Sequence, residues 1–236
     1  MEVVNLKITG EHIDILRKDS LAALTGGTGR ANPETLAGLE RALETVRVSA
    51  EPLGGYRYAR ITEVTRTEAN TLLGPVASTR FALMARRSSG EKQVVFTLST
   101  LGESVDEAIA GDVPLLDKFV LDAVASELAE MVAGLVEEHW MEEVGAAGRE
   151  ASARMSPGYC DWLIGGQAIV FRALDAAALG VRLTDSFLMI PAKSVSSAAV
   201  VADEVPLKVQ CLACRRQDCL FRRGAADDTW SDELAR

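Results

Sequence analysis

A long apolar pattern in the middle of the chain most limits the folds that this sequence can adopt. Apolar residues recur at helical spacing from Leu115 to Val136, directly after Pro114, a residue type that suits the start of a helix. A strand-like run, residues 93–100, precedes them. A helix with such a stripe needs an apolar surface to pack against. We therefore expect a long helix packed on a sheet.

Strand-like and helical patterns also occupy the first part of the chain. Residues 3–8 and 56–65 favour strands, whereas residues 12–24 and 33–46 carry apolar side chains at helical spacing. The fold class that these patterns predict is α+β, with a twisted, mainly antiparallel sheet and helices packed on one of its faces.

Several local predictions concern the elements around this sheet. Residues 67–73 favour a short helix, and residues 81–87 and 93–100 favour two antiparallel strands joined by a turn at 88–90. Later in the chain the patterns favour, in order, a helix, a strand and a polar loop, at residues 162–174, 183–189 and 191–196.

The composition is that of an ordinary globular chain with an acidic balance. The 236 residues are 48% hydrophobic and 25% charged, with a formal net charge of −9. Nucleic-acid binding needs clustered Lys and Arg, so this balance argues against nucleic acid as a partner. No apolar run approaches the ~20 residues that cross a bilayer, and residues 1–7 lack the features of a signal peptide. We expect a cytoplasmic protein with no membrane partner.

Two linked motifs carry the functional information. The first is Arg154-Met-Ser-Pro-Gly-Tyr-Cys-Asp-Trp162, and the second runs from Gly180-Val-Arg-Leu-Thr-Asp-Ser to Met-Ile-Pro-Ala-Lys-Ser-Val-Ser196. Pro157-Gly158 fixes one backbone angle and frees the next, which favours a sharp turn that presents neighbouring side chains. In order and separation the two motifs resemble the reactivation domain of cobalamin-dependent methionine synthase, in a stand-alone form associated with corrinoid methyltransferases.

The resemblance implies three segments in one chain. Residues 101–205 would be the reactivation-domain-like core, and residues 1–100 would be an N-terminal α/β part of the same globular unit. Residues 206–236 would form a Cys-rich tail that holds a metal or an iron–sulfur cluster.

The resemblance also implies roles for particular residues. Arg154 would contact the carboxylate of S-adenosylmethionine, because a guanidinium donates two parallel hydrogen bonds to a carboxylate. Tyr159 would lie beside the corrinoid as the catalytic residue. The alternative for Arg154 is that it satisfies carbonyl groups under the turn. The implied cofactor-binding set comprises Arg154, Pro157, Gly158, Tyr159, Lys193, Ser194, Val195 and Ser196.

One departure from the resembled family concerns the methyl donor. The family places aromatic residues after the second motif, where they contact S-adenosylmethionine, whereas residues 197–201 contain none. Cation–π support for a sulfonium is therefore missing at these positions.

Cysteine spacing predicts a metal site near the end of the chain. Cys211, Cys214 and Cys219 fall within nine residues, and Cys160 could supply a fourth thiolate. Four thiolates suit either zinc or an iron–sulfur cluster, and the spacing does not choose between them. The remaining alternative is a set of reduced thiols without metal. A redox role for the resembled fold favours the iron–sulfur cluster.

Acidic residues near these motifs have plain structural interpretations. Asp161 and Asp185 are expected to cap or close turns. Glu127, Glu130, Glu137 and Glu138 are expected to form the solvent-exposed face of the long helix.

The function that we expect is reductive reactivation or remethylation of a corrinoid-dependent methyltransferase, which would itself carry the cobalamin. One alternative is a methionine synthase reactivation subunit that binds S-adenosylmethionine. Another is a non-catalytic docking module whose Cys-rich tail is held together by a structural zinc ion. The sequence leaves open whether the chain is itself an enzyme; as one, it would belong to a cobalamin-dependent methyltransferase system. The methyl acceptor and the electron donor also remain open.

Overall fold

The computed structural model describes residues 1–25 and 30–206. Six α-helices and two short 3-10 helices lie in this part of the chain, and the α-helices are α1 (Gly10–Leu24), α2 (Pro33–Ser49), α3 (Thr79–Arg87), α4 (Glu103–Ala110), α5 (Leu115–Ala146) and α6 (Gln167–Ala173). The 3-10 helices are η1 (Ile164–Gly166) and η2 (Ala176–Leu179). No helix in the described ranges is both long enough and apolar enough to span a bilayer.

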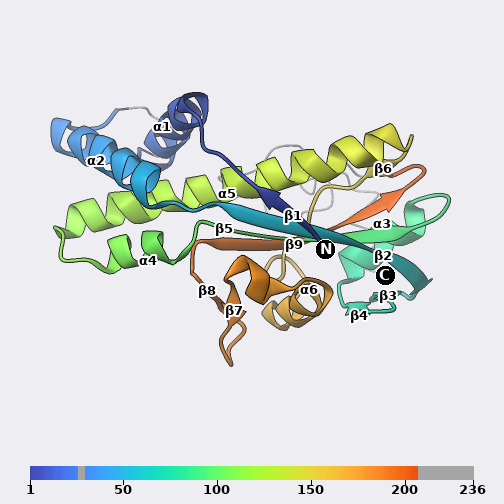
Figure 1. Ribbon diagram of the computed structural model, residues 1–236. Coiled ribbons are helices and arrows are strands. Elements are labelled where there is room, and N and C mark those ends of the chain that lie inside the picture. The colour runs from blue at the N-terminus through green and yellow to red at the C-terminus, as the bar shows by residue number, and fades with distance from the viewer. Residues whose placement is uncertain (26–29, 207–236) are drawn as a thin grey trace.

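Nine strands complete the described part of the fold, and they are β1 (Glu2–Asn5), β2 (Leu53–Val64), β3 (Ala69–Thr71), β4 (Gly74–Val76), β5 (Gln93–Thr100), β6 (Glu150–Ala151), β7 (Arg182–Leu183), β8 (Met189–Ile190) and β9 (Ser194–Ala202). Seven of them form one antiparallel sheet in the order β4-β3-β2-β5-β9-β6, with β1 paired to β2. Strands from both ends of the described chain meet in this sheet (Figure 1). The predicted α+β class is confirmed.

The two faces of the central sheet are covered by different helices. Side chains alternate across a strand, so successive residues of β9 enter different cores. Ala198 and Val200 join the core formed with α3 and α6, whereas Ala199 and Val201 pack toward α5. The sheet therefore separates an α5 layer from an α3 and α6 layer, as Figure 1 shows. The expectation that the helices would cover one face of the sheet is wrong, because both faces of β9 are apolar and need cover.

The predicted long helix is α5, and it packs on the sheet as expected. Its first half forms a core with α1, α2 and α4, and its second half packs on β2, β5 and β9. Gly54 of β2 permits a close approach, because a Cβ atom there would lie 2.2 Å from Val136 Cγ2. Farther along α5, the carboxylate of Glu143 accepts hydrogen bonds from the hydroxyls of Tyr56 and Tyr58 of β2 at 2.7 and 3.1 Å.

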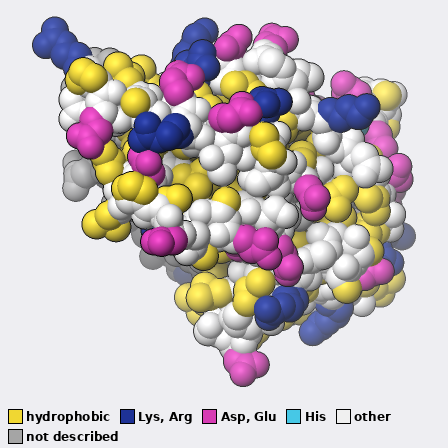
Figure 2. Space-filling model, turned by 60° about the vertical axis from the view of Figure 1, so that its left-hand side comes forward, with side chains coloured by type: hydrophobic (Ala, Val, Ile, Leu, Met, Phe, Trp, Pro, Cys, Tyr) yellow, Lys and Arg dark blue, Asp and Glu magenta, His cyan; other side chains and the backbone are white. Residues whose placement is uncertain are grey.

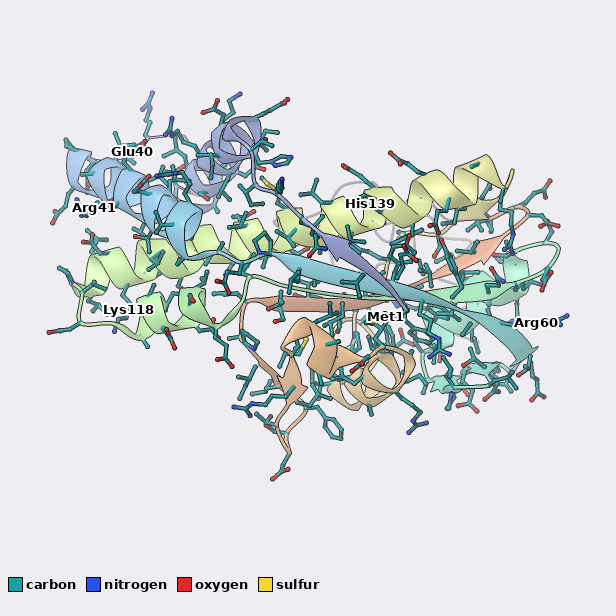
Figure 3. The ribbon with its side chains drawn as sticks, in the orientation of Figure 1. Met1, Glu40, Arg41, Arg60, Lys118 and His139 are labelled. Atoms are coloured by element: carbon teal, nitrogen blue, oxygen red, sulfur yellow. The ribbon has the colours of Figure 1, made fainter. Side chains whose placement is uncertain are left out.

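The helices α1 and α2 start where their sequences supply caps. The Thr9 side chain accepts a hydrogen bond from the His12 amide, and the Asn32 side chain accepts one from the Thr35 amide. Both helices lie beside the first half of α5, at the end of the molecule opposite Arg60 of β2 (Figure 1, Figure 3).

The strand expected over residues 81–87 is wrong, because this segment belongs to helix α3. The Ser78 side chain accepts a hydrogen bond from the Phe81 amide and so caps the helix. Residues 81–85 are all buried, so the period-2 burial of a half-exposed strand is absent from these residues. Ala, Leu, Met and Arg, which fill most of α3, favour helices.

Four smaller expectations also need correction. Residues 67–73 contain β3 and lead into β4, and Gly74 at a φ of 130° lets the chain turn between them. The strand expected over 183–189 is instead a hairpin of β7 and β8. Of the loop expected over 191–196, the last three residues are the start of β9. The helix expected over 162–174 is shorter, comprising η1 and α6.

Candidate functional site

The first motif folds into a closed turn. The Gly158 amide donates to the Trp162 carbonyl at 2.7 Å, and the Tyr159 amide donates to the Ser156 carbonyl at 3.2 Å. Gly158 has a φ of 92°, a conformation that glycine adopts at little cost. The side chain of Tyr159 is 68% exposed. The turn therefore presents this aromatic side chain to solvent on a hydrogen-bonded backbone.

Both ends of the turn are anchored in the core that lies under α3 and α6. Met155 exchanges two backbone hydrogen bonds of 2.8 Å with Ala198 of β9. Trp162 is 3% exposed, and its ring lies 6.2 Å from that of Phe81 of α3. Between these anchors, Cys160 is exposed and has a φ of 55°, which is unusual for a residue other than glycine.

Asp161 links the turn to the start of α3. Its carboxylate accepts hydrogen bonds from the Ser78 hydroxyl at 3.1 and 3.2 Å and from the Arg80 amide at 3.2 Å. The Arg80 side chain adds an ion pair, with Nε 3.5 Å from the carboxylate. The capping role expected for Asp161 is confirmed, although the helix that it caps comes from a distant part of the chain.

Arg154 reaches to α5 and contacts two carboxylates. Its Nη2 lies 3.0 Å from Glu130 Oε2, and its Nε lies 3.1 Å from Glu137 Oε2. The sequence interpretation placed both glutamates simply on the solvent-exposed face of the helix. Their seven-residue spacing, which puts them two turns apart on one helix face, was the signal that could have indicated a shared partner.

Lys193 also contacts α5 rather than solvent. Its Nζ lies 2.7 Å from Asp122 Oδ1 and 2.9 Å from Ser126 Oγ, and its side chain is 12% exposed. Val195, two residues later, packs against the core that α5 shares with α1, α2 and α4. These contacts connect the start of β9 to the long helix.

Ser194 and Ser196 of the second motif are buried and have protein partners. The Ser194 hydroxyl donates to Thr100 Oγ1 at 2.9 Å, and the Ser196 hydroxyl donates to Gln167 Oε1 of α6 at 2.6 Å. The exposed hydroxyl-rich loop that the sequence suggested is therefore replaced by a buried polar connection between β5, β9 and α6.

A second exposed loop lies beside the turn. Phe187 and Leu188 occupy the connection of the β7–β8 hairpin, where Phe187 has a φ of 62°. A Cβ atom on Gly165 of η1 would lie 3.9 Å from the Phe187 ring, so the hairpin approaches η1. The hairpin projects at the lower edge of the molecule, on a surface of mixed hydrophobic and charged side chains (Figure 1, Figure 2).

Five exposed hydrophobic side chains lie on the turn, at the start of η1 just after it and on the hairpin loop. We call them the apolar rim, and they are Tyr159, Leu163, Ile164, Phe187 and Leu188. Their exposed fractions run from 38 to 79%, so the rim remains accessible to a partner. Cys160 and Phe187 are the residues other than glycine that have a positive φ in the described chain, and such conformations concentrate at functional sites.

The predicted thiolate site lies mostly beyond the part of the chain that the structure describes. Cys211, Cys214 and Cys219 fall outside residues 1–25 and 30–206, and Cys160 is exposed within them. Within those ranges no three His, Cys, Asp or Glu residues gather in an arrangement that could hold a metal ion.

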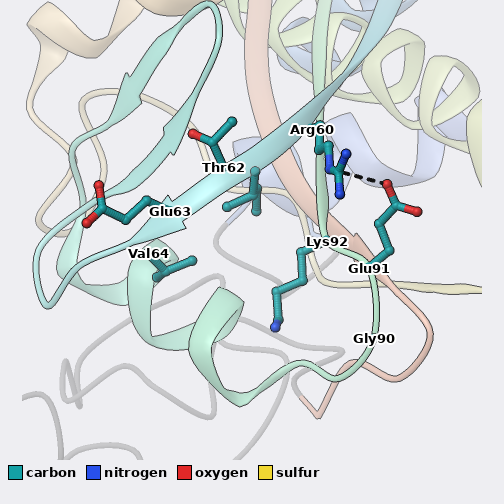
Figure 4. Close-up of a pocket in the computed structure, with 8 residues that line it drawn as sticks. Arg60, Thr62, Glu63, Val64, Gly90, Glu91 and Lys92 are labelled. Carbon is teal, nitrogen blue, oxygen red and sulfur yellow. Dashed lines mark ion pairs between the residues drawn. The ribbon is translucent and has the colours of Figure 1, made fainter.

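A shallow hollow of about 330 Å³ lies at the far end of β2, as Figure 4 shows. It is lined by residues 60–64 and 90–92, and Arg60 Nε lies 3.5 Å from Glu91 Oε1 beside it. None of its lining residues belongs to either sequence motif.

A solved structure matches this arrangement over the whole chain. The crystal structure of the MetH reactivation domain bound to AdoHcy aligns with a TM-score of 0.60, covering 100% of this chain and 90% of that one. The chain has the MetH reactivation-domain fold. At 15% sequence identity, the likeness to the reactivation domain establishes the fold alone. No protein-family model and no curated protein matches the sequence.

Proposed function

We propose that the protein is a reactivation partner of a corrinoid-dependent methyltransferase of the methionine synthase type, acting in the cytoplasm. It docks on the corrinoid-carrying protein and helps to return the cobalt to its active reduced or methylated state. The observation that carries this proposal is the exposed Tyr159, held on an anchored turn within the reactivation-domain fold. The corrinoid belongs to the partner.

The apolar rim supplies the docking contacts in this proposal. A corrin ring has a broad apolar face, and exposed aromatic and aliphatic side chains gain free energy when they cover such a face. Tyr159 would meet the corrinoid, and Phe187 and Leu188 would cover the ring edge or the protein around it. Pro157 and Gly158 set the backbone direction of the turn, which is how they contribute to the site.

The proposal extends to a ligand of the S-adenosylmethionine class. The similar solved domain binds AdoHcy, and Arg154 has the chemistry to bind a ligand carboxylate. Glu130 and Glu137 compete for the same guanidinium, so the ligand would have to displace at least one of them. Lys193 and the first residues of β9, Ser194, Val195 and Ser196, would support this site by connecting it to α5 and α6.

The four cysteines are proposed to hold a metal. Cys160 is exposed beside Tyr159. A set of four thiolates suits a zinc ion or an iron–sulfur cluster. A cluster would supply one-electron redox chemistry, whereas zinc would have a structural role. Metal analysis and visible absorbance of protein purified without oxygen, compared with a Cys214→Ser variant, distinguish the two.

Direct binding tests the docking proposal. The probe is the cobalamin-loaded corrinoid domain of a methionine synthase, titrated against the full chain by calorimetry. We expect binding that weakens at least about tenfold in Tyr159→Ala, since burial of an aromatic side chain contributes more than 1.4 kcal/mol. Leu115→Ala, which removes an exposed hydrophobic side chain from the start of α5, should leave the affinity unchanged.

The other outcomes separate the alternatives. Binding of AdoHcy without binding of the corrinoid domain would replace this proposal with that of a methyl-donor-binding subunit. Absence of both, with stoichiometric zinc in the protein, would favour the non-catalytic docking module.

A further inference from the structure

We infer that Asp161 is a positioning residue that sets the orientation of Tyr159 by holding the turn on the start of α3. What Tyr159 contacts rests on the proposed function; how Tyr159 is held rests on the geometry around Asp161. Asp161 follows Tyr159 by two residues, and both belong to the exposed part of the turn, residues 158–161.

Asp161 meets three donors, and all of them come from the first turn of α3 or its cap. The Ser78 hydroxyl lies within 3.2 Å of both carboxylate oxygens, the Arg80 amide donates at 3.2 Å, and Arg80 Nε lies at 3.5 Å. The first turn of α3 contains no acidic residue of its own. Asp161 therefore supplies from a distant segment the negative charge that favours a helix N-terminus.

On the α3 side, Ser78 takes part in hydrogen bonds as both donor and acceptor. Ser78 is 2% exposed, and its oxygen also accepts a hydrogen bond from the Phe81 amide while its hydroxyl faces Asp161. Rotation of the Asp161 carboxylate away from α3 would leave both the Ser78 hydroxyl and the Arg80 amide without this partner. The Ser78 hydroxyl is buried, so the loss of its partner costs free energy, and the contact therefore holds residue 161 against the helix.

Holding the Asp161 carboxylate on the start of α3 restricts the backbone of the residues that precede it. The Gly158 amide must reach the Trp162 carbonyl, and Trp162 is itself buried, so the backbone from 158 to 162 has to close within a few residues. Cys160 takes a φ of 55° to allow this closure. A strained conformation of this kind persists only when the surrounding contacts impose it, and the outward direction of Tyr159 is its result.

Fluorine spectroscopy tests the inference without any partner. The chain has three tyrosines, so protein labelled with 3-fluorotyrosine gives three ¹⁹F resonances, and Tyr159→Phe assigns one of them. In Asp161→Ala we expect the Tyr159 resonance to shift and broaden, while those of Tyr56 and Tyr58 stay in place because they report the contact between β2 and α5. Asp161→Asn retains an acceptor for Ser78 and should restore most of the original position.

Two further variants keep the test decisive. Asp112→Ala removes an exposed aspartate between α4 and α5 and should leave all three resonances unchanged. If Asp161→Ala does not fold, Ser78→Ala removes the hydroxyl from the other side of the contact and should shift the Tyr159 resonance in part. An unmoved Tyr159 resonance in a folded Asp161→Ala protein, or in Ser78→Ala when the first variant does not fold, overturns the inference.

Binding measurements separate this inference from the proposed function. If Asp161→Ala moves the Tyr159 resonance but Tyr159→Ala binds the corrinoid domain as tightly as the original protein, the positioning role stands and the docking role of Tyr159 fails. If both roles hold, Asp161→Ala weakens corrinoid-domain binding, and the loss is not additive with that of Tyr159→Ala.

Discussion

For Arg154, the sequence predicts the kind of group that the side chain contacts but not which residues supply that group. Its motif position indicates a role with carboxylates, because a guanidinium is the side chain best suited to them. The carboxylates that it contacts in the structure are Glu130 and Glu137 of α5. The sequence could not name them, since the position of Arg154 depends on tertiary contacts such as the backbone hydrogen bonds of Ser152 and Met155 to β9.

This contact gives a test of the proposed ligand site. Glu137→Gln should strengthen AdoHcy binding by about three- to fivefold, because an ion pair of up to about 1 kcal/mol no longer competes for the Arg154 guanidinium. Calorimetric titration with AdoHcy measures the change. Glu138→Gln, an exposed neighbour on the same helix, serves as the control. Equal affinities in all three proteins would argue that Arg154 does not bind the ligand carboxylate.

At the scale of elements, the sheet centre and the long helix were predictable, and the short connecting elements were not. The patterns of β2, β5 and α5 are long enough for periodicity to identify them. α3 is short and buried over five consecutive residues, so its sequence lacks the contrast that separates helix from strand. Likewise, Ser194 and Ser196 are polar residues within a strand, and their buried partners come from β5 and α6.

The close packing of η1 on the turn predicts a sharp difference between neighbouring glycines. In Gly166→Ala the new methyl group would lie 2.1 Å from Trp162 Nε1. In Gly165→Ala the nearest neighbouring heavy atom, Phe187 Cε2, lies 3.9 Å from the new methyl group. We expect Gly166→Ala to destabilise the protein by about 1–3 kcal/mol, as overpacking does, and Gly165→Ala to have little effect. Urea unfolding followed by Trp fluorescence measures both. Equal stability of the two variants would contradict this packing.

At the scale of the whole molecule, the contact between α5 and the sheet includes two tyrosines, Tyr56 and Tyr58, whose pKa values are raised. Burial, together with the hydrogen bond to Glu143, raises the pKa of Tyr56 above its ordinary value of 10. Tyr58 shows the same direction, again from burial and from the charge of Glu143. Both tyrosines therefore keep their protons in the folded state at a pH at which an unfolded chain loses them.

The sign of the effect on stability follows from this difference. Below about pH 10 both states hold the proton of Tyr56 and its contribution is fully present; above that, the unfolded state loses the proton first, and the free energy of unfolding falls as pH rises. Tyr56 contributes a slope of at most about 1.4 kcal/mol per pH unit. Urea unfolding at pH 8 and at pH 10.5–11.5 should show a shallower decline in Tyr56→Phe. The same decline in both proteins would exclude this contribution.

The separation of the helices into two layers, one on each face of the sheet, has a practical consequence. The apolar rim lies on loops anchored in the α3 and α6 layer, and α1 and α2 pack on α5 on the other side of the sheet. A linker or fluorophore attached through a cysteine introduced at the exposed Glu11 or Glu34 would therefore leave the rim open. The protein can thus be tethered to a sensor surface through its helical side, with the rim directed into solution, so that weak and short-lived encounters with a partner become measurable.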